Sequence, residues 1–163
     1  MGGRPSPEEV WPVAADRFAD VQRVFQPGRV IAGNLRRGAD LLEFLTETAR
    51  RHQVRAGAYN FFGAVTEARV AFYDVSRKVY EEIVRAENLE IVSGMGNVSL
   101  RDGEIFVHAH AAFSDRQGNM FGGHLNPGTV VLAGEFVLWE LVGEPFQRDL
   151  DPVTGLRLWH ISS

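Results

Sequence analysis

The sequence predicts an α+β fold in which one main helix packs on a curled, mainly antiparallel β-sheet. Residues 39–53 carry apolar side chains at helical spacing. Almost everything after residue 57 consists of short runs rich in β-branched and aromatic residues. Turn-prone pairs such as Asp102-Gly103 separate several of these runs, as is typical of strands joined by hairpins. One helical layer against one sheet is the simplest way to bury these apolar faces.

The chain divides into a leader and one domain. Residues 1–18 contain three prolines and two early glycines and are expected to form a flexible N-terminal leader without the features of a signal peptide. Residues 19–163 have the length of a single domain.

The first elements of the domain are two short strands and the helix. Residues 21–25 and 29–35 are rich in β-branched residues, and Gln26-Pro27-Gly28 between them predicts a turn. The helix follows over residues 39–53. Asp40 is placed to cap its start, and basic residues in its last turns complement the helix dipole.

The rest of the domain is expected to be β-structure. The candidate strands are residues 58–65, 67–74, 78–85, 89–100, 104–114, 129–141 and 156–161. Further turns are predicted at residues 115–119, 126–128 and 151–152, which are rich in Asp, Asn, Gly and Pro.

Composition limits the partners of the chain. The formal net charge is −4 at pH 7, which is unfavourable for general binding to nucleic acid. There are no cysteines, so a metal site would have to use histidine, carboxylate or water. No apolar run approaches the roughly 20 residues that span a bilayer. We therefore expect a cytoplasmic protein without a membrane partner.

The most informative segment, residues 105–125, contains three of the five histidines. His108 and His110 are two residues apart, so on a strand both rings project from one face. His124 follows Gly122-Gly123, where the backbone is expected to turn sharply and bring the third ring close. Three converging imidazoles are typical of an open divalent-metal site.

Zinc is the expected ion, because tetrahedral zinc accepts three histidines and keeps a fourth position for water or substrate. Iron, nickel or manganese are alternatives. The competing interpretation is that these histidines are ordinary core or interface residues that donate hydrogen bonds to backbone.

Two further sites are candidates for chemistry. Glu135 could act as a catalytic acid or base, or could orient a histidine ring, and the alternative is a solvent-facing carboxylate. Arg36 and Arg37 precede the helix and could hold a small anionic ligand, although a solvated loop is the simpler explanation.

Several motifs in this order resemble the PPC (plants and prokaryotes conserved) domain family. They are GRVIAGNLRRGADLLEFL, LEIVSGMGNVSL, HAHAAFSDRQGNMFGGHL and AGEFVLWEL, over roughly residues 20–143. The resemblance implies an α/β fold with a central antiparallel sheet, usually assembled as a homotrimer, and relatives described as metal-containing or DNA-binding. Plant members carry an AT-hook, of which this chain has only Gly3-Arg4-Pro5 without the flanking basic residues.

A more distant resemblance, at the level of the fold, is to acetolactate decarboxylase, whose zinc is held by three histidines. The main hypothesis is a metal-binding, homo-oligomeric PPC-domain protein that uses His108, His110 and His124. The alternatives are a DNA-binding, transcription-associated module and a metal-dependent enzyme acting on a small oxo- or hydroxy-acid.

Overall fold

The computed structural model describes residues 18 and 20–160. Within that part of the chain there are one helix and nine strands. They are β1 (Gln26–Asn34), α2 (Leu41–Arg51), β2 (Gly57–Asp74), β3 (Val79–Arg85), β4 (Leu89–Arg101), β5 (Glu104–Ser114), β6 (Met120–Leu125), β7 (Val130–Val142), β8 (Gln147–Leu150) and β9 (Arg157–His160). The α+β prediction is confirmed.

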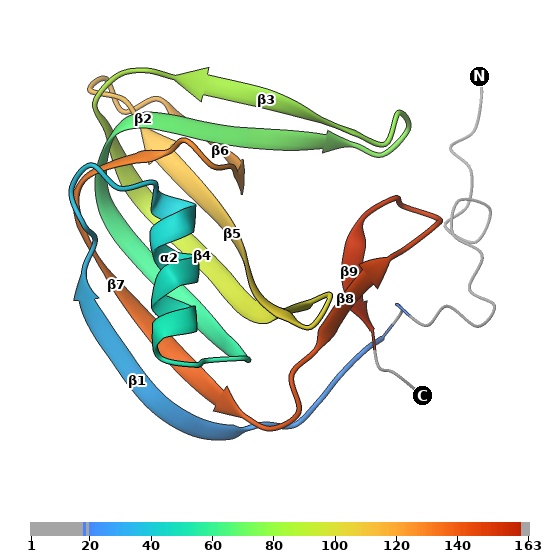
Figure 1. The fold of residues 1–163 in the computed structure, drawn as a ribbon. Helices are drawn as coiled ribbons and strands as arrows, with labels where there is room; N and C mark the ends of the chain where they lie inside the picture. Colours follow the sequence, from blue (N-terminus) through green and yellow to red (C-terminus); the bar gives the residue numbers. More distant parts are fainter. Residues whose placement is uncertain (1–17, 19, 161–163) are drawn as a thin grey trace.

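All nine strands belong to one strongly curled sheet (Figure 1). The first half of β2 pairs with β7 and β4, and its second half pairs with β3 and β6. Because β4 pairs with β5 and β5 with β6, the series β2–β4–β5–β6 returns to β2 and closes on itself. The pairings are antiparallel except for β4 with β8. This closure places β6, and with it His124, beside β5.

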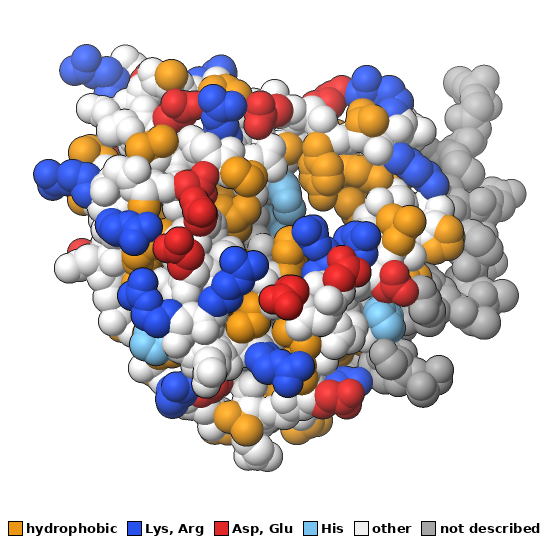
Figure 2. All heavy atoms as spheres, in the orientation of Figure 1, with side chains coloured by type: hydrophobic (Ala, Val, Ile, Leu, Met, Phe, Trp, Pro, Cys, Tyr) orange, Lys and Arg blue, Asp and Glu red, His pale blue; other side chains and the backbone are white. Residues whose placement is uncertain are grey.

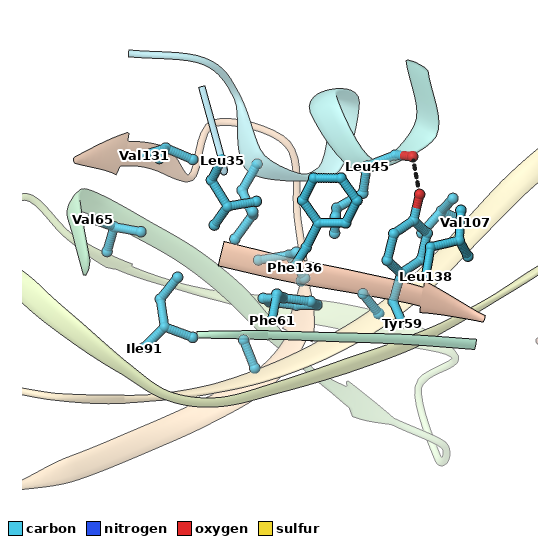
Figure 3. Packing of buried hydrophobic residues seen from close by; sticks show 14 of the residues in the cluster. Leu35, Leu45, Tyr59, Phe61, Val65, Ile91, Val107, Val131, Phe136 and Leu138 are labelled. Carbon is cyan, nitrogen blue, oxygen red and sulfur yellow. Dashed lines mark hydrogen bonds between the residues drawn. The ribbon is translucent and has the colours of Figure 1, made fainter. Parts of the chain in front are cut away.

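The helix packs against the sheet and completes the main core (Figure 3). Leu41, Leu45 and Ala49 are fully buried and share one face of α2. The hydroxyl of Tyr59 on β2 donates a hydrogen bond to the carbonyl oxygen of Leu45 at 2.8 Å (Figure 3). A buried hydroxyl or carbonyl group without a hydrogen-bond partner destabilises the fold, so this bond fixes the position of the helix over β2.

The predicted helix is confirmed, with ends about two residues inside residues 39–53. The Asp40 side chain caps it by accepting a hydrogen bond from the backbone N–H of Glu43. Arg50 and Arg51 occupy its last turn, where positive charge is favourable.

The hairpin predicted over residues 21–35 is wrong. Residues 21–25 lie outside the strands, and Pro27 and Gly28 lie within β1 itself. The pairing of β1 with β7 is interrupted between Pro27 and Val30, so Pro-Gly produces an irregularity there instead of a turn. An edge strand has one free side, which tolerates a proline that lacks an N–H.

Most other strand predictions are confirmed, with three differences. Residues 58–65 and 67–74 form one continuous strand, β2. Strands β6 and β8 were not predicted. The predicted turn at Asp102-Gly103 is confirmed: both residues have positive φ (54° and 83°) and join β4 to β5.

The leader predicted over residues 1–18 lies, apart from Phe18, outside the described residues. Within the described residues, no helix combines the length and the apolar character needed to cross a membrane.

Candidate metal centre

Strand alternation puts His108 and His110 on the face of β5 that is turned away from the main core. Val107, Ala109 and Ala111 alternate with them and are buried in that core. His124 on β6 is the direct antiparallel partner of His110. Directly opposed residues project from the same face of a sheet, so the three imidazoles meet on one side of β5 and β6.

The three rings form one compact group. Nε2 of His108 lies 3.0 Å from Nδ1 of His124. The ring centroids are 4.8 to 5.4 Å apart, and one nitrogen from each residue lies within 4.8 Å of the others. Zinc holds imidazole nitrogens at about 2.0–2.1 Å, which at tetrahedral angles separates two of them by roughly 3.4 Å. Small shifts of the side chains would therefore bring all three to one ion.

The glycines before His124 serve a different purpose from the predicted sharp turn, and that prediction is corrected. Gly122 and Gly123 lie in extended β6, between β5 and β2. A Cβ on Gly122 would lie 2.5 Å from the carbonyl oxygen of Ala111, and one on Gly123 would lie 2.6 Å from that of Ala71. These glycines allow close approach of the neighbouring backbones, which brings His124 to His108 and His110.

The histidines are held in their neutral form. Burial, reinforced by the positive charge of Arg148, lowers the pKa of His108 to about 3. Burial also lowers the pKa of His124 to about 4, and the partial desolvation of the more exposed His110 shifts its pKa in the same direction. Neutral imidazoles have a free lone pair at physiological pH, which is the form that binds metal.

Arg148 on β8 is a charged residue that contacts this group. It is 8% exposed and donates hydrogen bonds to the Ser99 hydroxyl, the Asn97 side-chain oxygen and the Arg157 carbonyl oxygen. Its Nη2 lies 3.4 Å from Nδ1 of His108. Burial lowers the pKa of Arg148 to about 10, so it remains a cation at neutral pH.

A cavity of about 640 Å³ opens beside the histidines. Figure 2 shows a histidine side chain at the base of a hollow between hydrophobic and basic side chains. The residues that line the cavity come from β2, β3, β4, β5, β6 and the β8–β9 hairpin. This volume is typical of sites for small molecules.

The other predicted site residues lie elsewhere. Glu135 is exposed on β7, where it pairs with Asn34 and Phe62, and it is not among the described residues that line the cavity. Arg36 forms an ion pair with Glu47, and Arg37 donates to the carbonyl oxygen of Leu132. The structure does not bring these three side chains to the histidines.

Sequence reasoning missed Arg148 and Arg101, which do line the cavity. The hairpin that carries Arg148 pairs with β4, far away in the sequence. A lone arginine in a short polar strand carries no local signal of such a position.

Comparison with known proteins supports this architecture. A family model for the Plants and Prokaryotes Conserved (PCC) domain matches residues 22–142. The chain is 34% identical to a metal-containing protein from Archaeoglobus fulgidus, with a TM-score of 0.80 and coverage of 85% of this chain and 99% of that one. It is 31% identical to a plant- and prokaryote-conserved (PPC) protein from Pyrococcus horikoshii, with a TM-score of 0.82 and coverage of 88% and 99%.

Two further similarities are less direct. A structure from Bacteroides thetaiotaomicron, provisionally named as DNA-binding, is 22% identical with a TM-score of 0.75 over 84% of this chain and 97% of that one, which supports the fold alone. The bifunctional protein GlmU of a Synechococcus strain is 34% identical over 135 residues, which are 82% of this chain and 20% of that protein. This chain thus spans about a fifth of the length of its curated relatives. The family match and the two structural matches above 30% identity together show that the chain belongs to the Plants and Prokaryotes Conserved (PCC) domain family.

Proposed function

We propose that this protein binds a divalent transition metal ion, zinc in the first instance, through His108, His110 and His124. The observation that carries the proposal is the convergence of three neutral imidazoles from two adjacent strands, with ligand nitrogens within 4.8 Å of one another. The metal-containing relative from Archaeoglobus fulgidus, 34% identical, is consistent with it.

The chain's own residues determine what such an ion would experience. Strand pairing sets the positions of the imidazoles, and burial keeps those of His108 and His124 unprotonated. A three-histidine zinc ion offers a further coordination position, at which it can polarise a carbonyl group or acidify bound water. The cavity beside the histidines gives small molecules access to that position.

Metal analysis of the purified, untagged protein tests the proposal. After incubation with zinc and dialysis without chelator, we expect about one zinc per chain in the wild type. His110→Ala and His124→Ala should lose most of it with the fold retained, because removing one ligand opens the site without emptying the core. His52→Ala, at the half-buried C-cap of α2 and not among the described residues that line the cavity, is the matched control. Wild-type protein that takes up no zinc would assign the three histidines to structural or interface roles.

A second candidate is a metal-dependent enzyme acting on a small oxo- or hydroxy-acid. The cavity of about 640 Å³ next to the histidines favours it. The catalytic role predicted for Glu135 stays a prediction, as does any likeness to acetolactate decarboxylase. Turnover of small oxo-acids by the zinc-loaded protein, compared with His110→Ala and Glu135→Gln, would test both ideas. Turnover of a small oxo-acid by the zinc-loaded wild type would support the enzyme hypothesis if His110→Ala abolishes it.

Assembly and DNA binding are separate proposals. A homotrimer would provide a partner surface for exposed apolar side chains such as Val30 and Phe62, which are 62% and 57% exposed. Sedimentation equilibrium would determine the stoichiometry. DNA binding and a cytoplasmic location stay predictions, and titration of labelled duplex DNA at two salt concentrations would test the former.

A further inference from the structure

We infer that the cavity beside the histidines binds a small organic monocarboxylate, with its carboxylate at Arg101 and its apolar body against the aromatic wall. The inference rests on the proposed metal site for the ion's contribution. The arginines and the aromatic wall support it independently.

The charge of the cavity is the first argument. The chain has 21 Asp and Glu against 17 Lys and Arg, yet the described residues that line the cavity include three arginines and no carboxylate. The arginines are Arg101, Arg148 and Arg157. A concave site with cations and low-dielectric walls concentrates anions from solution.

The three arginines have different roles. Arg148 already uses its N–H groups on Ser99, Asn97 and the Arg157 carbonyl, so it contributes charge and position. Arg157 pairs with Asp102 at 3.6 Å. Among the described residues Arg101 has no carboxylate partner.

Arg101 is placed to receive a ligand. Its guanidinium lies over the ring of Phe106, 4.6 Å from the centroid. Stacking on an aromatic face orients a guanidinium while leaving its in-plane N–H groups free to donate. Such a fork matches the two oxygens of a carboxylate.

The wall of the cavity is the second argument, because it fits the rest of such a ligand. Phe72, Phe106 and Leu158 contribute apolar surface, and Phe72 is 65% exposed. An apolar ligand that covers such an exposed side chain removes apolar surface from water, which makes binding more favourable. Inorganic phosphate would satisfy the arginine but not this wall.

The metal position is the third argument. Three neutral imidazoles would leave both positive charges of a divalent ion uncompensated, and Arg148 adds a further positive charge close by. An anionic ligand would relieve this excess, since bound cations are often the largest local charges in a site.

The test uses phenylacetate as the probe and phenylacetamide as its uncharged isostere. Titration calorimetry on the zinc-loaded wild type should show saturable binding of phenylacetate and about tenfold weaker binding of phenylacetamide. Inorganic phosphate should bind more weakly than phenylacetate. Equal affinity for the acid and the amide, or no saturable binding of phenylacetate at millimolar concentration, would overturn the inference.

Arg101→Gln tests the assigned contact. Because Arg101 is exposed, the substitution should leave the fold intact and weaken phenylacetate binding about five- to tenfold. Arg116→Gln, in the exposed turn between β5 and β6, is the matched control and should bind like the wild type. An unchanged affinity in Arg101→Gln would sink the assignment.

Repeating both titrations on chelator-treated protein separates this inference from the metal proposal. If the protein takes up no zinc but Arg101→Gln still weakens phenylacetate binding relative to Arg116→Gln, the anion site stands and the metal site fails. If zinc binds through the histidines but the arginine substitution has no effect, the anion site fails and the metal site stands.

Discussion

The guanidinium of Arg148 lies against the imidazole of His108, with Nη2 3.4 Å from Nδ1. A guanidinium only donates hydrogen bonds, so Nδ1 is the acceptor in this arrangement and the hydrogen of His108 resides on Nε2, directed at Nδ1 of His124. Histidines that bind metals usually donate their second N–H to a carboxylate or carbonyl. Metal binding through Nε2 of His108 would therefore require the ring hydrogen to shift to Nδ1, and Nη2 of Arg148 would then have to move out of hydrogen-bond distance, because both groups would be donors.

Arg148→Met should separate the structural role of Arg148 from its electrostatic one. The variant loses the hydrogen bonds to Ser99, Asn97 and Arg157 together with the contact to His108, and it leaves the fully buried Ser99 hydroxyl without this donor, so the free energy of unfolding should fall by about 2–4 kcal/mol. The pKa of His108 should rise from about 3 but stay below its ordinary value, because burial is the larger cause of its shift. Urea unfolding and NMR titration of the imidazole measure the two effects.

Arg116→Met, at an exposed position, is the control for Arg148→Met and should change neither quantity. An unaltered His108 pKa in Arg148→Met would contradict the electrostatic role assigned to Arg148.

Acid should destabilise the chelator-treated protein before its carboxylates titrate. The folded pKa values of His108 and His124, about 3 and 4, lie below the ordinary 6.5, so the unfolded chain binds more protons between these limits. The stability that the neutral rings contribute is complete above pH 6.5 and is lost as the pH falls towards 4 for His124 and towards 3 for His108. Urea midpoints between pH 7 and pH 5 should decrease, less so in His108→Gln.

Gly122→Ala tests the close approach of β6 to β5. Its Cβ would lie 2.5 Å from the carbonyl oxygen of Ala111, so the backbones must separate. We expect a loss of about 1–3 kcal/mol in stability and at least a tenfold weaker zinc affinity, because His124 moves away from His110.

Gly118→Ala is the companion of Gly122→Ala. Its Cβ would have nothing within 4 Å, and its cost comes from the positive φ of 83° alone. It should lower stability and leave zinc affinity unchanged. Equal zinc affinities in the two variants would show that close approach at Gly122 does not position His124.

Tyr59→Phe should weaken the docking of the helix. The change removes the hydrogen bond to the Leu45 carbonyl while keeping the ring, so stability should fall by about 1 kcal/mol. Tyr80→Phe, at a residue that is 47% exposed, should cost less. Chemical denaturation of both variants gives the comparison, and equal losses would argue against this role for the Tyr59 hydroxyl.

Much of the fold could be predicted from local patterns. The helix period, the Asp40 cap and the Asp102-Gly103 turn depend on interactions within a few residues, and the structure confirms them. The Pro27-Gly28 turn was predicted wrongly because the same pair also fits an irregular edge strand. Only the pairing with β7 distinguishes the two.

The candidate site was predictable to a similar extent. Alternation along a strand requires His108 and His110 to share a face, so these two ligands could be paired from the sequence. Gly122-Gly123 marked the third, although for the wrong reason: the glycines permit close strand packing and do not form a turn.

The sequence by itself therefore determined the helix, most strands and the grouping of the three histidines, because periodicity and turn chemistry are local properties. Only the tertiary structure decided that β6 returns to β2, that Arg148 lies behind His108 and that Glu135 lies away from the cavity. Pairing between distant strands depends on how the whole sheet curls to bury its core, and no local pattern encodes that choice.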